Sequence, residues 1–253
     1  MKIIEQVRKK QPLIHHLTNE VVMNFTANGL LSFGGSPLMA KEVEEAEDLA
    51  KIADGILINI GTMLHSEFEA MIIAGTTANE RGIPVVLDPV GVAASNFRRQ
   101  AVQTLLEEIK FTAIKGNVGE MAYLVDIVLE TKGVDSVDEG VNEVEEIALK
   151  VAHKYHTIAV GTGKIDAVAM GNQVKVNEAG HHYLPRITGA GCLLGSIVTA
   201  CLTTDTDSFE AAYEAVRFYG KAAEHAVNQN YVNGPGTFLP HFVDALGMSF
   251  DLR

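Results

Sequence analysis

The chain lacks tryptophan and carries only two cysteines, Cys192 and Cys201, among its 253 residues. Both cysteines lie in one segment that predicts a helix, where neighbouring thiols are badly placed for a disulfide and lack the spacing of metal ligands. The first twelve residues, MKIIEQVRKKQP, show no apolar core followed by a cleavage site, which argues against a secretory signal. These absences predict a protein of the reducing cytoplasm.

The chain is also short of basic residues, with 20 Lys and Arg against 32 Asp and Glu, so its formal net charge is -12. Such a charge makes nucleic acids and anionic membrane surfaces poor partners. No stretch reaches the roughly 20 apolar residues of a membrane-spanning helix. An enzyme of this charge that handles phosphate must neutralise its substrate locally, with backbone amides, a metal ion and one or two cations.

Apolar runs alternate with segments of helical spacing along most of the chain. Continuous apolar runs predict buried strands at 55–61, 83–89, 112–117 and 157–163. Helical spacing is found at 43–52, 65–81, 101–109, 119–129, 141–155, 193–202, 208–228 and 238–246, and residues 167–176 predict a hairpin. This alternation predicts an α/β fold with a mostly parallel sheet covered by helices on both faces. Because no linker or repeat interrupts it, we expect a single domain over residues 1–253.

The most informative stretch is PRITGAGCLLGS, residues 185–196. Gly189, Ala190 and Gly191 form a turn that opens an apolar helix, so several N–H groups point one way with the positive end of the helix dipole behind them. This arrangement binds anions, and phosphate is the usual occupant. Cys192 lies where a group being phosphorylated would approach, and its place at a helix N-terminus predicts a lowered thiol pKa.

Polar residues end the predicted strands, namely Asn59, Asp88, Lys115 with Asn117, and Thr162. Ligands of open α/β sheets bind beyond the carboxyl ends of the strands, so we expect these side chains to converge. Asp88 suits Mg²⁺, and Lys115 suits a phosphate. Glu120, three residues after Asn117, fits a metal role or a helix capping box equally well.

Each of these signals has an ordinary structural alternative when it is taken alone. Asp88 precedes a proline and fits a turn, Lys115 fits a solvated lysine, and the glycines around Thr162 fit a plain turn that lacks the phosphate-loop pattern. A zinc site at His15, His16, His181 and His182 is disfavoured, because adjacent histidines point in different directions. A Cys–His hydrolase lacks a supporting context around Cys192. The ordered series as a whole, however, is what phosphoryl transfer from a nucleotide requires.

The series resembles the ribokinase-like superfamily and, within it, the hydroxyethylthiazole kinase family over residues 12–246. The resemblance is carried by HLTN at 16–19 with Met23-Asn24, ANGLL at 27–31, GSPLMA at 35–40, INIGT at 58–62, LDPVG at 87–91, Gly116-Asn117 with Glu120, TGAGC at 188–192, and GPG at 234–236 with Phe242 and Asp244. It implies a three-layer ribokinase-like fold and a homotrimer with active sites between neighbouring subunits. It also implies ATP- and Mg²⁺-dependent phosphorylation of the hydroxyl of 4-methyl-5-(2-hydroxyethyl)thiazole in thiamine biosynthesis or salvage.

The same resemblance implies roles for individual residues. Met39 and Gly189 would contact the thiazole with Asn19 and Met23 nearby, Lys115 and Thr162 would contact ATP, and Asp88 and Glu120 would act on Mg²⁺ and the phosphates. The amides of Gly189, Ala190 and Gly191 would hold the charge that develops on the phosphoryl group. Many relatives carry arginine where this chain has Lys115, which keeps the charge without the planar fork.

Cys192 stands where most of the superfamily has a catalytic aspartate, and the resemblance implies that it assists catalysis. A thiol takes a proton only weakly, but a loose transition state requires little proton transfer early on. Two other functions fit the sequence less well. A kinase of another vitamin-precursor alcohol, such as a hydroxymethylpyrimidine, is disfavoured because this chain has cysteine rather than aspartate at 192. A catalytically silent binding protein is disfavoured because Asp88 and Glu120 are both present.

Overall fold

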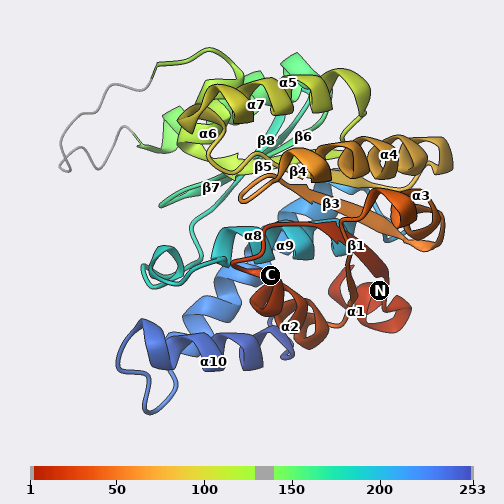
Figure 1. The fold of residues 1–253 in the computed structure, drawn as a ribbon. Helices are drawn as coiled ribbons and strands as arrows, with labels where there is room; N and C mark the ends of the chain where they lie inside the picture. The colour runs from red at the N-terminus through yellow and green to blue at the C-terminus, as the bar shows by residue number, and fades with distance from the viewer. Residues whose placement is uncertain (1–2, 129–139, 252–253) are drawn as a thin grey trace.

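The computed structural model describes residues 3–128 and 140–251, and an eight-stranded sheet forms its middle layer (Figure 1). The strands are β1 (Leu13–Leu17), β2 (Ser36–Met39), β3 (Gly55–Asn59), β4 (Val85–Asp88), β5 (Ala113–Asn117), β6 (Ile158–Thr162), β7 (Asp166–Met170) and β8 (Gln173–Asn177). They are ordered β2-β1-β3-β4-β5-β6-β7-β8. Neighbours from β2 to β6 pair in parallel, and β7 and β8 continue the sheet antiparallel.

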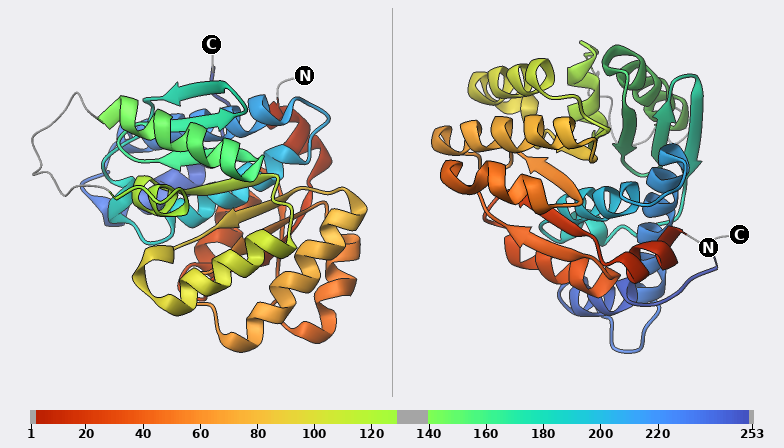
Figure 2. Two further views of the ribbon diagram at one scale, coloured as in Figure 1. Left: turned by 90° about the horizontal axis from the view of Figure 1, so that it is seen from above. Right: turned by 90° about the vertical axis from the view of Figure 1, so that its right-hand side faces the viewer.

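Two layers of helices cover the sheet, one on each face (Figures 1 and 2). One layer holds α3 (Val43–Ile52), α4 (His65–Arg81), α5 (Asn96–Glu108), α6 (Val118–Leu124) and α7 (Gly140–Tyr155). The other holds α1 (Ile3–Lys10), α2 (Met23–Phe33), α8 (Ala190–Leu202), α9 (Ser208–Val227) and α10 (Pro235–Leu246). Short 3-10 turns, η1 (Val92–Ala94) and η2 (Leu184–Arg186), precede α5 and α8.

The strands divide their side chains between the two layers by simple alternation. Ile56 and Ile58 of β3 pack in the core under α3 to α7, whereas Leu57 packs in the core with α8 and α9. Both faces of the strand are therefore apolar, which explains the continuous apolar runs in the sequence. The α/β class with a mostly parallel sheet between helices is confirmed. The expectation of one domain over residues 1–253 stays a prediction.

The sequence pattern does not predict the helices and strands before residue 43, namely α1, β1, α2 and β2. Strand β1 escaped notice because two buried histidines, His15 and His16, interrupt its apolar pattern. Strand β2 begins Ser36-Pro37, a pair that suggests a turn, but proline is tolerated because β2 is an edge strand.

Elsewhere the differences concern the ends of helices. The helix expected at 119–129 ends at Leu124, since Asp126 adopts a left-handed φ of 59°, and Leu129 lies outside the described residues. Helix α10 begins at Pro235 rather than Phe238, because proline is accepted in the first helical turn. None of the helices in the described part of the chain has the length and apolar character needed to cross a membrane.

Candidate active site

The glycine-rich turn opens α8 at the edge of the sheet where the parallel strands end (Figure 1). Gly189 caps the helix with a left-handed φ of 91°, and a Cβ at this position would lie 2.7 Å from Cγ1 of Val22. Glycine is therefore required here for both conformation and space. The first N–H groups of a helix have no intrahelical acceptor, so those of Ala190, Gly191 and Cys192 form an anion-binding end.

The ends of β3, β4 and β5 meet beside this turn. Asn59 and Asp88 are paired in register, and the Asn59 amide donates to Oδ2 of Asp88 over 2.8 Å. Nζ of Lys115 lies 3.3 Å from the other oxygen, Oδ1 of Asp88. Asp88 is 0% exposed and Lys115 only 4%, so this is a buried ion pair. A Cβ on Gly191 would lie 3.0 Å from Nζ of Lys115, which places a buried cation directly against the turn.

The thiol of Cys192 is joined to this cluster by two asparagines. Its Sγ accepts hydrogen bonds from Asn59 over 3.2 Å and from Asn19 over 3.4 Å. The Asn19 amide also donates to Oδ1 of Asn59 over 3.0 Å, and that oxygen accepts from the Gly61 N–H at 3.0 Å. A continuous chain of polar contacts thus runs from Lys115 through Asp88 and Asn59 to the sulfur.

Burial and neighbouring charges set the pKa values of the cluster. Burial would lower the pKa of Lys115, but the carboxylates of Asp88 and Glu120 outweigh it and raise that pKa, so the ammonium stays charged. Burial, together with the charge of Asp88, raises the pKa of the Cys192 thiol. The lowered thiol pKa expected from the helix N-terminus is therefore wrong, because desolvation and a neighbouring carboxylate outweigh the dipole. Cys192 is a neutral thiol at pH 7.

Glu120 forms the capping box of α6. Its Oε2 accepts from the Asn117 N–H and Oδ1 of Asn117 accepts from the Glu120 N–H, both over 2.9 Å. Oε1 of Glu120 accepts from the Gly91 N–H over 2.9 Å, which ties the loop after β4 to α6. The capping alternative is thus confirmed. A metal role remains compatible with it, because a carboxylate has further lone pairs and Glu120 is only half-buried.

The other predicted residues lie around this cluster. Thr162 ends β6 opposite Asn117 and donates to the Gly116 carbonyl over 3.3 Å. Met39 ends the edge strand β2 beside His16 of β1, and Met23 begins α2; both methionines are half-buried. Met39 therefore lies at the same edge of the sheet as Asn19, which follows β1.

Both ring nitrogens of His16 have structural partners. His16 is fully buried between the Ile14 carbonyl and Oγ of Ser196, with Nδ1 and Nε2 at 2.8 and 2.7 Å. Burial lowers the pKa of His16 to about 4, so the ring is neutral. His181 packs against His182 with ring centroids 4.1 Å apart. Within residues 3–128 and 140–251, no three His, Cys, Asp or Glu side chains are grouped so that they could hold a metal ion.

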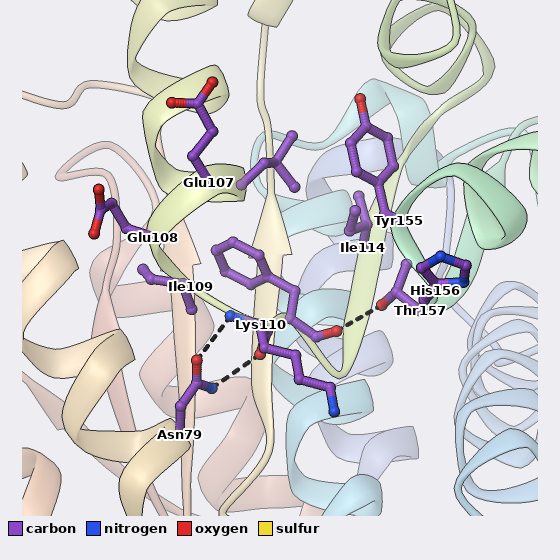
Figure 3. A pocket seen from close by; sticks show the side chains of 11 residues that line it. Asn79, Glu107, Glu108, Ile109, Lys110, Ile114, Tyr155, His156 and Thr157 are labelled. Carbon is purple, nitrogen blue, oxygen red and sulfur yellow. Dashed lines mark hydrogen bonds between the residues drawn. The ribbon is translucent and has the colours of Figure 1, made fainter.

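A cavity of about 440 Å³ opens at the opposite edge of the sheet, where β5 and β6 begin (Figure 3). The Asn79 side chain there bonds to the backbone N–H and carbonyl of Lys110 over 2.7 and 2.9 Å. Thr157 donates to the Phe111 carbonyl over 2.8 Å. These polar groups join helices to the starts of strands, so we interpret the cavity as a structural feature. We place the catalytic chemistry at the edge of the sheet where the parallel strands end.

Comparison with known proteins agrees with this geometry. Residues 4–250 match the model of the hydroxyethylthiazole kinase family. The chain is 57% identical over 244 residues to hydroxyethylthiazole kinase 1 of Oceanobacillus iheyensis, covering 96% of this chain and 94% of that protein. A solved hydroxyethylthiazole kinase from Pyrococcus horikoshii OT3 is 35% identical with a TM-score of 0.88, covering 97% of this chain and 91% of that one.

A more distant structure, a ribokinase-like superfamily protein of Enterococcus faecalis, is 12% identical. Its TM-score is 0.67 over 92% of this chain and 86% of that one, which shows a shared fold alone. The ribokinase-like fold and the family resemblance predicted from the sequence are confirmed.

Proposed function

This chain belongs to the hydroxyethylthiazole kinase family, and on that premise we propose that it transfers the γ-phosphoryl group of ATP to the hydroxyl of 4-methyl-5-(2-hydroxyethyl)thiazole, in thiamine biosynthesis or salvage. One observation supports the assignment most strongly. The ammonium of Lys115 is buried against Gly191, beside the free N–H groups at the start of α8. The phosphoryl group carries negative charge during its transfer, and such a site stabilises that charge.

The turn and the ion pair act together in this mechanism. The amides of Gly189, Ala190 and Gly191 face the transferring group, and the ammonium of Lys115 adds positive charge from behind these amides. Asp88 keeps that ammonium in place, since Oδ1 of Asp88 is its partner at 3.3 Å. Because these groups are already arranged before ATP arrives, little reorganisation is needed during the reaction.

Cys192 lies at the acceptor side of the turn and, as a neutral thiol, is a weak base. The two asparagine amides direct its sulfur, so it positions the substrate hydroxyl, whose proton passes late to an oxygen of the transferred phosphoryl group. Positioning and electrostatics therefore supply most of the rate. The substrate itself is placed by Met39, Gly189, Asn19 and Met23, which lie at this edge of the sheet.

The contacts distinguish the two acids proposed for Mg²⁺. Asp88 is fully buried beneath the turn, so it does not fit as a direct ligand of a hydrated cation. The half-buried carboxylate of Glu120 fits a hydrated cation that arrives with ATP, with Asp88 acting on it only through charge. When bound, Mg²⁺ neutralises phosphate oxygens. Lys115 and Thr162 hold the nucleotide beside it.

We also propose a homotrimer, in the cytoplasm, with active sites between neighbouring subunits. Edge strand β2 and helix α2 line one flank of the site, and Val21 and Leu31 on this flank are 69% and 58% exposed. Apolar side chains exposed beside a site fit coverage by a second copy. Light scattering at assay concentration tests the assembly: a mass of one subunit would reject it.

An ADP-release assay with a panel of vitamin-precursor alcohols tests the activity. We expect ADP to be released with the thiazole alcohol and Mg²⁺, together with formation of the thiazole phosphate. Turnover of a hydroxymethylpyrimidine but not of the thiazole would support a different vitamin kinase. Binding of the thiazole and ATP without ADP release would show a silent binding protein.

A further inference from the structure

Arg98, which no sequence pattern singled out, joins the two loops that carry the polar cluster. It lies in the first turn of α5, where Oγ of Ser95 caps the helix by accepting from the Arg98 N–H over 3.3 Å. One arm of its guanidinium, Nη1, donates to the Val90 carbonyl over 2.5 Å, and the other, Nη2, donates to the Gly61 carbonyl. Val90 and Gly61 each follow by two residues a strand end of the cluster, Asp88 and Asn59.

Main-chain groups connect the two hydrogen bonds of Arg98 to Asn59 and Glu120. The peptide N–H of Gly61 donates to Oδ1 of Asn59, which fixes the orientation of the amide that donates to Cys192. On the second loop, the N–H of Gly91 donates to Glu120, so Arg98 and Glu120 hold the two sides of one peptide group, the one between Val90 and Gly91. A single side chain therefore connects, through these loops, to both the thiol of Cys192 and the carboxylate of Glu120.

Gly91 leaves space for the guanidinium of Arg98. Gly91 has a left-handed φ of 66°, and a Cβ on it would lie 2.7 Å from Nη1 of Arg98. A larger residue would displace the guanidinium from the Val90 carbonyl. Arginine suits the task because its planar group presents two donors in fixed geometry, whereas a lysine ammonium is a point charge on a flexible stem.

We propose that Arg98 is a positioning residue of the kinase: it holds the loops after β3 and β4 together and so orients Asn59, Cys192 and Glu120. This inference rests on the proposed function for its kinetic consequence. The guanidinium of Arg98 donates to two main-chain carbonyls of these loops, so Arg98 acts on the reacting groups through the loops. Its loss therefore affects kcat through misplacement of the reacting groups, and leaves the affinity for the alcohol largely unchanged.

The chain offers a matched control in the next residue. Arg99 lies on the same helix turn and carries the same charge, but it is exposed: it donates to the Ala93 carbonyl and the Asn96 side chain, and its guanidinium lies 5.5 Å from the centre of the Tyr123 ring. Arg98→Met, Arg98→Lys and Arg99→Met are compared with the wild type. We expect kcat to fall by about 10- to 100-fold in Arg98→Met with KM for the alcohol changed by less than about twofold, a smaller loss in Arg98→Lys, and no change in Arg99→Met.

A second readout is independent of activity. Iodoacetamide labelling of Cys192, followed by peptide mass spectrometry, reports the packing of the thiol; Cys201 is fully buried and serves as an internal reference. Labelling of Cys192 should be several-fold faster in Arg98→Met than in Arg99→Met, with Cys201 unlabelled in both. If Arg98→Met does not fold, Arg98→Lys must show both effects.

Wild-type kcat and labelling in a folded Arg98 variant would overturn the proposal, as would equal losses in Arg98→Met and Arg99→Met. A wild-type enzyme without ADP release would reject the proposed function instead, while the labelling comparison would still test Arg98.

Discussion

Replacing Lys115 by methionine separates the two roles that the structure gives this residue, as the partner of Asp88 and as the cation of the anion site. The ammonium is 4% exposed and lies 3.3 Å from a carboxylate that is 0% exposed. Removing one member of a buried ion pair leaves the other charge buried without a partner, which lowers the free energy of unfolding by about 3–5 kcal/mol. For a chain of this size, each kcal/mol lowers Tm by about 2–4 °C, so we expect a fall of about 6–20 °C.

The loss of stability should depend on pH in a defined direction. Burial raises the pKa of Asp88, and Lys115 opposes this rise. Without the ammonium the pKa of Asp88 rises further, and a carboxyl whose pKa is raised by folding loses stability as pH increases through that pKa. The difference in unfolding free energy between wild type and Lys115→Met should therefore be larger at pH 8 than at pH 5. Urea denaturation at the two pH values measures it.

Two further variants distinguish stability from catalysis. Lys115→Arg keeps the cation and should retain both stability and turnover. Lys115→Met combined with Asp88→Asn removes both charges and should recover most of the stability, because no buried charge is left unpaired. Turnover in this double variant should remain at least about 100-fold below wild type, as expected when one group of an oxyanion site is removed. The reasoning would be refuted if the unfolding free energy of Lys115→Met lay within about 1 kcal/mol of the wild-type value, or if the double variant had wild-type turnover.

Three other changes give sharp expectations. Cys192→Ser should retain measurable turnover, at about a tenth of wild type, because the thiol only assists; complete loss in the folded variant would make the thiol essential. Folding lowers the pKa of His16 from 6.5 to about 4, so the neutral ring contributes about 3 kcal/mol to the free energy of unfolding above pH 6.5, and this contribution is lost as pH falls towards 4. His16→Gln should therefore reduce the difference between the unfolding free energies measured in urea at pH 7 and at pH 4. An unchanged difference would contradict this. Gly189→Ala forces a side chain into a φ of 91° against Val22, so it should lower stability by about 1–3 kcal/mol and reduce turnover, whereas Gly236→Ala, which has open space, should do neither in the same two assays.

How far the sequence predicts this molecule depends on whether the cause is local. Helices 43–52 and 65–81 were predicted to the residue, because their apolar spacing and flanking residues are local signals. The meeting of Asn59, Asp88 and Lys115 was also predictable, since parallel strands end at one edge of a sheet. Strand β1 was not predictable in this way, because its histidines are buried by tertiary contacts with Ser196 of α8 and with Ala40, the residue after β2.

The missed features of the site act across space or through the main chain. Arg98 reaches the carbonyls of Gly61 and Val90, and sequence patterns do not show which carbonyl a side chain reaches. The pKa of Cys192 was predicted in the wrong direction, because its burial and its nearness to Asp88 arise only when α8 packs over β3 and β4. A helix N-terminus is visible in a sequence, but the desolvation around it is not.

The charge of the buried cluster explains how a cysteine can serve at position 192. Lys115 and Asp88 cancel, and a neutral thiol leaves that balance unchanged. An aspartate at 192 would set a second carboxylate beside Asp88 with one ammonium between them, and like charges in a buried site raise the pKa of one carboxyl. The thiol therefore gives up basicity and keeps Lys115 available to the incoming phosphate. Basicity is of little use in a loose transition state, whereas positive charge behind the amides acts throughout the transfer.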